Sequence, residues 1–410
     1  MKTISVFTGA GGLDLGLEAA GFEPALCIEI DPDARATLAA NRPRWKLSEP
    51  GDLLAASPEA FLKQAGLTRG EAALIVAGPE CQPFSHAARW ASNGARGLTD
   101  PRAHALEPLL KLMEVSLPRG VLLENVYGLV RPDHLGAIGY LKHRINQINQ
   151  RNGTHYMISE FRLNCADYGV PQVRRRAFIA IDREGGVLEP PEPTHTREEY
   201  VTAWDAIGDV EASESLEELE PTGKWAALLA TIPEGKNYLW HTARGGGVEL
   251  FGWRTRYWSF LLKLAKHKPS WTITANPGPA MGPFHWDSRR LSTAETLRLQ
   301  AFPDRYEIVG SFRSQRRQIG NATPPLLSEV VARHIAYHWF SRKITGRPAY
   351  FVKSKGTCPP PANRYPIPRK YLGLVGSYDP HPGATLGPGA VRSDANSTPA
   401  TKSEAARTTL

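Results

Sequence analysis

One cysteine stands where a nucleophile could be held. Cys81 follows the apolar run at 72–78 and lies between two prolines, in the stretch GPECQPFS. The chain has only four cysteines in 410 residues. A free cysteine is often a small buried core residue, whereas a thiol on a turn after a strand can act as a nucleophile. The residues that accompany Cys81 decide between these interpretations.

Polar residues also stand at the ends of three other segments. They are Glu124 in LLENV, Arg174 and Arg176 in VPQVRRR, and Asn321 in RQIGNAT. The carboxyl ends of strands in an open α/β sheet share one edge, where ligands bind, so Cys81 and Glu124 are expected to meet there. Each residue alone has a simpler explanation, because a carboxylate can be solvated or paired with lysine and a run of arginines is often an exposed face.

A glycine-rich turn predicts a nucleotide-type site. The stretch FTGAGGLDLG follows an apolar run at 2–7 and opens a helical pattern. Glycines let the backbone approach a ligand that faces the helix N-terminus. The dinucleotide pattern GxGxxG, started at Gly9, would need glycine at position 14, where Asp14 stands. For the glycines alone, a purely structural turn explains the pattern about as well as a ligand site does.

Two acids strengthen the prediction of a nucleoside ligand. Glu29 ends the second predicted strand, 20 residues after Gly9, where a carboxylate can bind both hydroxyls of a ribose. Asp52, in GDLL, could meet the amino group of an adenine. The turn and the acids suit a nucleoside without a pyrophosphate, such as S-adenosylmethionine, at least as well as NAD.

These residues need a sheet to position them, and the hydrophobic pattern predicts one. Apolar runs of strand length alternate with segments of helical periodicity over the first half of the chain. We therefore predict an α/β fold with a doubly wound, mostly parallel sheet and helices on both faces. The predicted strands cover 2–7, 24–31, 72–78, 120–126, 156–169 and 174–182, and the predicted helices cover 8–21, 32–43, 134–151 and 324–340.

The pattern changes near residue 183. A proline-rich stretch and an acidic stretch lead into clusters of Trp, Gly and Arg without strand–helix alternation. A last amphipathic helix then returns, and the chain ends in a segment rich in Pro, Gly, Ser and Thr. The predicted organisation is a catalytic domain at 1–189, a smaller irregular domain at 190–315, a returning segment at 316–345 that completes the first domain, and a disordered basic tail at 346–410.

Composition limits the class of protein. The net charge is +8, but residues from Arg347 onward contain nine Lys or Arg and three Asp or Glu, so +6 of the charge lies in the last segment. The body is nearly balanced, and binding of nucleic acid must therefore rest on local patches. No apolar run approaches the roughly 20 residues that cross a bilayer, and the N-terminus enters a strand pattern without room for a signal peptide.

Cysteine usage favours a reduced, cytoplasmic protein. The four cysteines show no CxxC pair and no spacing typical of metal ligands. Disulfides, structural zinc and other metals are therefore not expected. Cys27 and Cys165 lie in strand patterns and are assigned to the core.

Taken together, these stretches resemble the DNA (cytosine-5)-methyltransferase family of the bacterial modification type. The match is to an ordered set that spans residues 5 to about 335, with a variable section before the sixth member. The set is FTGAGGLDLGLEAAGF, EIDPDA, GPECQPFS, ENV, NCADYGVPQVRRR, RRLSTAETLRLQAFPD and RQIGNATPP.

The resemblance implies a role for each candidate residue. Cys81 would be the nucleophile, Glu124 the acid beside the base, and Arg176, with Arg174, the support of the cytosine and the catalytic loop. S-adenosylmethionine would be held by Phe7, Gly9, Gly11, Gly12, Leu13, Glu29, Asp52 and Asn321.

The chemistry of cytosine explains these residue types. Carbon 5 is a poor nucleophile, but addition of a thiolate to carbon 6 makes the ring enamine-like. Negative charge develops at N3 and O2, where Glu124 can donate a proton and an arginine can bind. After methyl transfer a base, such as water, removes the proton on carbon 5 and Cys81 leaves. The cytosine must first swing out of the duplex, because the stack shields the reacting atoms.

One residue departs from the family pattern. Glu80 occupies the position before Cys81, where the family usually has proline. A neighbouring carboxylate raises the pKa of a thiol above its reference of about 8.5 and opposes thiolate formation. The effect is small if the Glu80 side chain points to solvent, and large if it faces Cys81.

The resemblance also assigns a target. The variable section would read double-stranded DNA, with arginines on guanine edges and lysines on phosphates, although most of its tryptophans are expected to form a small core. It implies a cytoplasmic monomer without membrane contact, working opposite a restriction endonuclease on the same site without a stable complex. Two alternatives stay open: an RNA cytosine methyltransferase, and a catalytically silent DNA-binding relative. Asp14 and the Cys81/Glu124 pair disfavour a nicotinamide oxidoreductase.

Overall fold

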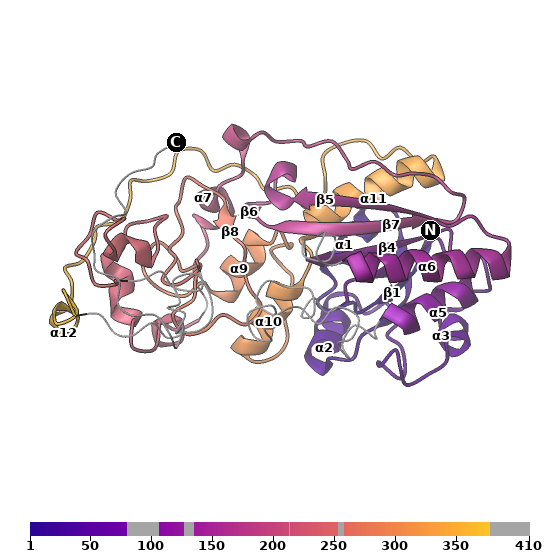
Figure 1. The fold of residues 1–410 in the computed structure, drawn as a ribbon, viewed down its shortest axis with the longest axis horizontal. Helices are drawn as coiled ribbons and strands as arrows, with labels where there is room; N and C mark the ends of the chain where they lie inside the picture. Colours follow the sequence, from indigo (N-terminus) through magenta and orange to yellow (C-terminus); the bar gives the residue numbers. More distant parts are fainter. Residues whose placement is uncertain (80–105, 127–134, 213, 253–257, 378–410) are drawn as a thin grey trace, which may run out of the picture.

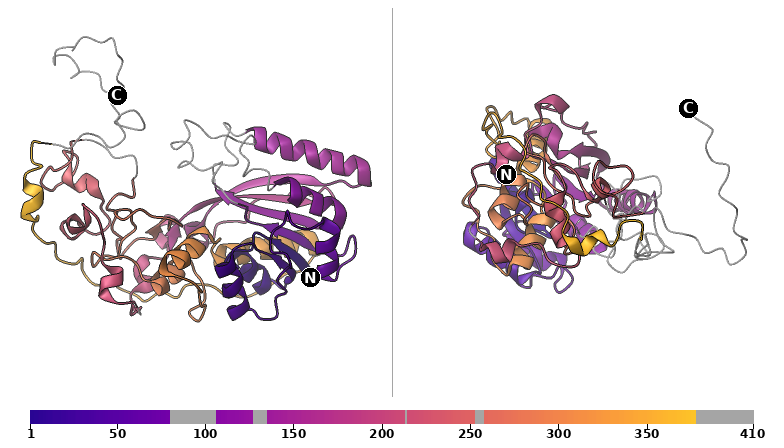
Figure 2. Two further views of the ribbon diagram at one scale, coloured as in Figure 1. Left: turned by 90° about the horizontal axis from the view of Figure 1, so that it is seen from below. Right: turned by 90° about the vertical axis from the view of Figure 1, so that its left-hand side faces the viewer.

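The chain folds into a layered α/β part and an irregular part beside it (Figures 1 and 2). The computed structural model describes residues 1–79, 106–126, 135–212, 214–252 and 258–377. Glu80 and Cys81 lie outside the described residues.

A six-stranded mixed sheet organises the first part. Its order is β2-β1-β3-β4-β7-β5, in which β2, β1, β3 and β4 run parallel and β7 runs antiparallel to both of its neighbours. The prediction of a mostly parallel, doubly wound sheet is confirmed. The strands are β1 (Lys2–Val6), β2 (Glu23–Ile28), β3 (Leu74–Ala77), β4 (Gly120–Val126), β5 (Met157–Asn164) and β7 (Arg175–Asp182).

Helices cover both faces because the buried strands alternate apolar residues between them. In β3, Ile75 and Ala77 belong to the core under α3, α5 and α6, whereas Leu74 and Val76 belong to the core under α1 and α11. Helix α2 packs at the edge, against a third cluster around Leu38. The helices are α1 (Gly12–Ala19), α2 (Pro32–Asn41), α3 (Pro58–Ala65), α5 (Leu106–Ser116), α6 (Leu135–Asn152) and α11 (Pro325–Phe340).

The irregular part contains short elements around two small aromatic-rich cores. A two-stranded parallel pairing of β6 with β8 joins it to the sheet region. Helices α9 and α10 lie where the two parts meet (Figure 1). The elements are β6 (Gln172–Val173), the 3₁₀ helix η7 (Arg197–Glu199), α7 (Ala203–Ile207), α8 (Leu216–Leu219), the 3₁₀ helices η8 (Ala226–Thr231) and η9 (Tyr238–His241), β8 (Ser270–Trp271), α9 (Thr293–Leu299) and α10 (Phe312–Asn321). The 3₁₀ helix η6 (Cys165–Tyr168), which follows β5, belongs instead to the core under α1 and α11.

The described part of the C-terminal segment is packed, which differs from the disordered tail expected from residue 346. Both oxygens of buried Glu329 accept a hydrogen bond from the backbone N–H of Ala349. The Oδ1 atom of Asp205 accepts hydrogen bonds from Ser354 Oγ and Lys355 N. Tyr371, in the short helix α12 (Arg369–Leu372), is buried in an aromatic core. The composition of the segment did not predict this packing, because only a few hydrogen bonds and one buried aromatic side chain fix a segment that is otherwise polar.

Buried cysteines contribute to the core as expected. Cys27 and Cys165 are both fully buried and carry no disulfide. Burial raises the pKa of the Cys165 thiol to about 12, so this side chain behaves as a small apolar residue at neutral pH.

Helices α1 and α11 approach so closely that a glycine is required between them. A Cβ atom on Gly16 would lie 2.3 Å from Glu329 N and 2.6 Å from Pro325 O. Both contacts are to backbone, which cannot rotate away as a flexible side chain can. In the next turn Ser328 Oγ donates a hydrogen bond to Leu13 O at 2.5 Å. The contact therefore ties the first helix of the chain to the last helix of this layer.

We predict that Gly16→Ala destabilises the protein by roughly 2–4 kcal/mol, because the added methyl group forces the two helix backbones apart. Urea unfolding followed by circular dichroism measures the change. The matched control is Gly139→Ala in α6, where an added Cβ meets nothing within 4 Å. That change should stabilise the helix by about 0.5–1 kcal/mol. Equal effects of the two substitutions would contradict the packing argument.

Candidate active site

A cavity of about 240 Å³ lies at the carboxyl edge of the parallel strands. Its lining comes from the turn after β1, the end of β2, Gly78 after β3, Glu124 of β4 and the C-terminal half of α10. It therefore brings together residues that are far apart in sequence. The predicted residues that line it are Phe7, Gly9, Gly12, Leu13, Glu29, Glu124 and Asn321.

Glu29 fixes the glycine turn. Its Oε2 accepts a hydrogen bond from Gly9 N at 2.7 Å, and its Oε1 accepts one from Asp31 N at 2.8 Å. Gly9 has φ +56°, and a Cβ there would meet no protein atom within 4 Å. Burial raises the pKa of Glu29, while the two backbone hydrogen bonds partly oppose that shift. Since each carboxylate oxygen has a second lone pair, Glu29 can still accept hydrogen bonds from a ligand.

Close packing against neighbouring residues explains the next two glycines, Gly11 and Gly12. A Cβ on Gly12 would lie 2.2 Å from Thr323 O, so this position lets the returning segment close against the turn. Gly11 has φ +76° and sits beside Leu38 and Tyr306. It is absent from the cavity wall. Of the three glycines predicted from the family resemblance, Gly9 leaves open space for a ligand. Gly11 and Gly12 instead allow neighbouring segments to pack closely around the cavity.

Glu124 and Arg176 form a buried ion pair beside the cavity. Arg176 Nε lies 2.7 Å from Glu124 Oε1, and both side chains are about nine-tenths buried. The antiparallel register pairs Arg176 with Val126 and Phe178 with Glu124. Residues two apart on a strand share a face, so this register brings Glu124 and Arg176 together. Glu124 Oε1 accepts no hydrogen bond within the described residues, so charge attraction is the contact that holds the pair.

The last described residues before Cys81 lie beside Glu124. A Cβ on Gly78 would lie 3.7 Å from Glu124 Oε2, and Asn125 Nδ2 donates a hydrogen bond to Pro79 O at 3.2 Å. Cys81 itself lies outside the described residues, and its role stays a prediction.

Arg174 points elsewhere. Its guanidinium donates hydrogen bonds to Ile273 O at 2.9 Å, Gly320 O at 2.7 Å and Ala322 O at 3.1 Å. The side chain is 1% exposed and does not line the cavity. These bonds connect β7 to the irregular part and to the end of α10. The geometry therefore favours a positioning role for Arg174, while Arg176 is the arginine that faces Glu124.

Asn321 and Asp52 differ in position. Asn321 ends α10 and lines the cavity. Asp52 does not, and its Oδ1 accepts a hydrogen bond from Leu54 N at 2.9 Å. Its neighbour Gly51 packs against Glu29 O, so the loop that carries Asp52 borders the site. A contact between Asp52 and a ligand stays a prediction.

Among the lining residues that the sequence did not assign to the site, three have side chains that bear on ligand binding or charge. Ile30 follows Glu29 and is 64% exposed, which presents an apolar surface at the cavity. Arg317 lines the cavity from α10 and pairs with Asp31 at 2.6 Å. The sequence could have indicated Ile30 and Arg317 as site residues, because they lie in the motifs EIDP and RQIGN close to Glu29 and Asn321. Asp14 also lines the cavity, although the sequence marked it only as a departure from GxGxxG.

Asp14 is a fully buried acid in the first turn of α1. Its Oδ2 accepts a hydrogen bond from Ser5 Oγ at 2.9 Å, and its Oδ1 accepts none from the described residues. Burial raises the pKa of Asp14 to about 7, and the Ser5 hydrogen bond opposes the shift. The cavity wall thus contains a carboxyl group that changes charge near neutral pH.

Two kinds of feature were searched for in the described part of the chain. No group of three or more His, Cys, Asp or Glu residues is placed to hold a metal ion there. No helix in those ranges is long and apolar enough to cross a membrane.

Comparison with known sequences shows one consistent similarity. Residues 1–337 match the family described as C-5 cytosine-specific DNA methylase. The Type II methyltransferase M.SacI of Streptomyces achromogenes is 34% identical over 371 residues, which cover 81% of this chain and 92% of that protein. The Type II methyltransferase M1.HphI of Haemophilus parahaemolyticus is 31% identical over 345 residues, covering 81% and 86%.

Solved structures show the same fold at lower identity. A structure described as a DNA modification methyltransferase encoded within a prophage (E. coli) superposes with a TM-score of 0.60 at 21% identity, covering 83% of this chain and all of that chain. Spodoptera frugiperda DNMT2 superposes with a TM-score of 0.53 at 15% identity, covering 82% and 99%.

The raised pKa of Asp14 predicts a pH-dependent stability. A carboxyl group with a folded pKa of about 7 and a reference value of 3.8 stabilises the folded state fully below pH 4, and this contribution is lost as the pH rises to 7. Asp14→Asn keeps an acceptor for Ser5 but does not ionise. The variant should therefore gain stability relative to wild type by at most roughly 1.4 kcal/mol per pH unit between pH 4 and 7.

Urea unfolding at pH 5, 6, 7 and 8 measures this difference. Asp33→Asn, in the first turn of α2, shows how much of the effect comes from replacing any first-turn acid. A difference for Asp14→Asn that stays constant over this pH range would show that Asp14 is already ionised when folded at pH 5.

Proposed function

Because this chain belongs to the C-5 cytosine-specific DNA methylase family, we propose that it methylates carbon 5 of a cytosine within a specific sequence of double-stranded DNA, through Cys81. The methyl group comes from S-adenosylmethionine. The observation that carries the proposal is the cavity that joins the glycine turn to the Glu124–Arg176 pair.

The residues of the cavity fit S-adenosylmethionine. Glu29 offers free lone pairs for a ribose diol, Ile30 offers an exposed apolar surface for a flat ring, and Gly9 leaves the backbone open to approach. Bound there, S-adenosylmethionine would supply the methyl group that is bonded to its positively charged sulfonium sulfur. Asn321 closes the pocket from α10, and Asp52 is proposed to meet the adenine from the bordering loop.

The ion pair between Glu124 and Arg176 supports the catalytic roles that the family resemblance implies. Cys81 adds to carbon 6 of a flipped-out cytosine, which activates carbon 5 for methylation. Glu124 holds a proton at N3, and Arg176 stabilises both the Glu124 carboxylate and the charge that develops at O2. Loss of the carbon-5 proton then expels Cys81. Arg174 holds β7 against residues 273 and 320 and acts on the reaction through that placement.

The proposal also includes how the DNA sequence is recognised and in which biological system the reaction takes place. The irregular part between β7 and α10 supplies the arginines and aromatic residues that read the DNA sequence. The M.SacI and M1.HphI relatives are Type II methyltransferases. We accordingly assign the chain to cytoplasmic DNA modification, as a monomer whose target site is shared with a restriction endonuclease.

Methyl transfer tests the function directly. Duplex DNA with methyl-labelled S-adenosylmethionine should acquire label as 5-methylcytosine, and Cys81→Ser should abolish the label because serine adds far less readily to carbon 6. Mapping the labelled sites gives the recognition sequence. Binding of S-adenosylmethionine without label in any duplex would favour the silent relative, and label in RNA alone would favour an RNA methyltransferase.

Glu124→Gln separates catalysis from cofactor binding. The amide keeps the shape of the side chain but cannot supply a proton to N3, so kcat should fall by roughly 10²–10⁴-fold. The dissociation constant of S-adenosylmethionine, measured by calorimetry, should change less than threefold. Glu114→Gln, on the exposed Glu114–Arg151 pair, is the control and should leave kcat unchanged. A normal kcat for Glu124→Gln would remove Glu124 from the mechanism.

A further inference from the structure

A second cavity, of about 380 Å³, lies on the other side of α10. It is formed by residues 275–279, 281 and 284 of the irregular part, by Arg290, and by the first turns of α10. Three of its lining residues are Arg290, Arg313 and Arg316, and none of the described lining residues is acidic.

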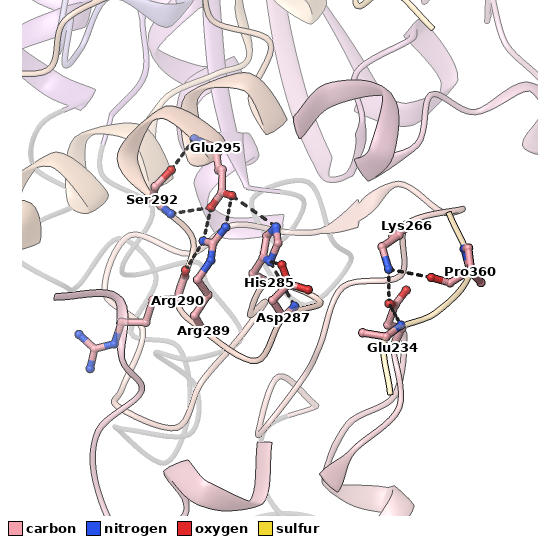
Figure 3. Close-up of polar contacts among 10 residues, drawn as sticks. Glu234, Lys266, His285, Asp287, Arg289, Arg290, Ser292, Glu295 and Pro360 are labelled. Carbon is pink, nitrogen blue, oxygen red and sulfur yellow. Dashed lines mark hydrogen bonds and ion pairs between the residues drawn. The ribbon is translucent and has the colours of Figure 1, made fainter. Parts of the chain in front are cut away.

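Among the residues that the structure describes, these three arginines lack the carboxylate partners that neighbouring arginines have. Figure 3 shows Arg289 making two hydrogen bonds to buried Glu295, at 2.6 and 2.8 Å, while the Arg290 side chain points away from that pair. Arg317, next to Arg316, pairs with Asp31. Within the described residues, no carboxylate lies at ion-pair distance from the arginines of this cavity. Arg290 Nη2 donates instead to Thr222 Oγ1 at 2.7 Å.

The cavity concentrates positive charge in a partly desolvated place. Arg316 is half-buried, with its guanidinium 5.6 Å from the centre of the Phe312 ring. Burial, and then repulsion from Arg290, lower the pKa of Arg316 to about 10, so the group stays charged at neutral pH. A bound anion would relieve the repulsion. Arginine forks match the oxygens of a phosphate better than those of a small spherical anion.

The position of the cavity indicates which phosphate it meets. Arg317, Gln318 and Asn321 line the S-adenosylmethionine cavity from the opposite side of the same helix. An α-helix with its side chains is about 10–12 Å wide, which is comparable to the roughly 12 Å width of the major groove of DNA. A duplex that delivers a base to the first cavity can therefore place a backbone phosphate in the second.

We propose that Arg290, Arg313 and Arg316 form a binding site for one backbone phosphate of the substrate DNA. The inference rests on the proposed function. The site holds the duplex in register while the catalytic residues act on the base, and it reads no sequence, because phosphate contacts carry none. Asn276, exposed at the rim, adds an amide donor.

The salt dependence of DNA binding tests the site. The probe is a labelled duplex that contains the sequence methylated by the wild-type enzyme, with a scrambled duplex beside it. For the Arg313→Gln/Arg316→Gln variant, Kd at about 0.1 M salt should rise roughly tenfold. The slope of log K against log salt should fall by about 1. Affinity should fall equally on both duplexes, and binding of S-adenosylmethionine should not change.

Controls identify the cause of any loss. Arg151→Gln, on exposed α6, removes the same charge far from the cavity and should leave the slope unchanged. Arg313→Lys/Arg316→Lys keeps the charge and should retain most of the slope. If the double Gln variant does not fold, the single Arg313→Gln, at an exposed position, carries the same measurement.

Neutral methylphosphonate linkages locate the phosphate. Replacing one phosphate should weaken wild-type binding but should not weaken binding by the double Gln variant any further. An unchanged slope, or a loss of affinity without a change of slope, overturns the site. Loss of inorganic phosphate binding with unaltered DNA affinity identifies a free-phosphate site and overturns it too. If wild type neither binds nor methylates DNA, the proposed function fails; if wild type methylates DNA and the variant keeps its slope, only this site fails.

Discussion

Close backbone packing between the first turn of the chain and its returning end is the constraint on which the candidate site depends. Gly12 lies against Thr323 O, Gly16 lies against Glu329 N, and Ser328 bonds to Leu13 O. Because Gly12 and Gly16 lie against backbone atoms, these two positions tolerate almost no increase in side-chain size. They fix α10, which precedes α11, at the mouth of the glycine turn. The cavity proposed for S-adenosylmethionine therefore has one wall from the start of the chain and one from the returning segment.

The arginines of the chain illustrate how burial sorts identical side chains into different roles. Arg176 faces a buried carboxylate and is available to the reaction. Arg174, two residues earlier, donates hydrogen bonds to three backbone carbonyl groups and thereby connects the two parts of the molecule. Within the described residues Arg316 has neither kind of partner, and it lines a cavity together with Arg290. A sequence motif marks arginines without distinguishing these roles, because the partners of Arg176 and Arg174 come from segments about 50 to 150 residues away.

The sequence predicted the features that depend on local pattern and on family resemblance. The alternation of apolar residues gave the mostly parallel sheet, and the ordered motifs gave the family, both of which are confirmed. The sequence also predicted that the polar ends of the strands lie at one edge of the sheet, and Glu29 and Glu124 do line one cavity there. It could not place Arg174, whose role depends on carbonyl groups near 273 and 320. It also treated residues 346–377 as a tail, because a few buried anchors such as Tyr371 do not alter a composition dominated by proline and polar residues.

Helix α10 joins the two binding events that the proposed reaction requires. Its Arg317 and Asn321 border the S-adenosylmethionine cavity, and its Arg313 and Arg316 border the arginine cavity. The helix is held at its end by Arg174, which donates to Gly320 O, and through Gln318 Nε2, which donates to Val309 O at 2.8 Å. A rigid helix with a binding site on each side keeps the distance between cofactor and DNA backbone constant. On the proposed function, the fold would then set the geometry between methyl donor and cytosine, while the variable part would read the DNA sequence.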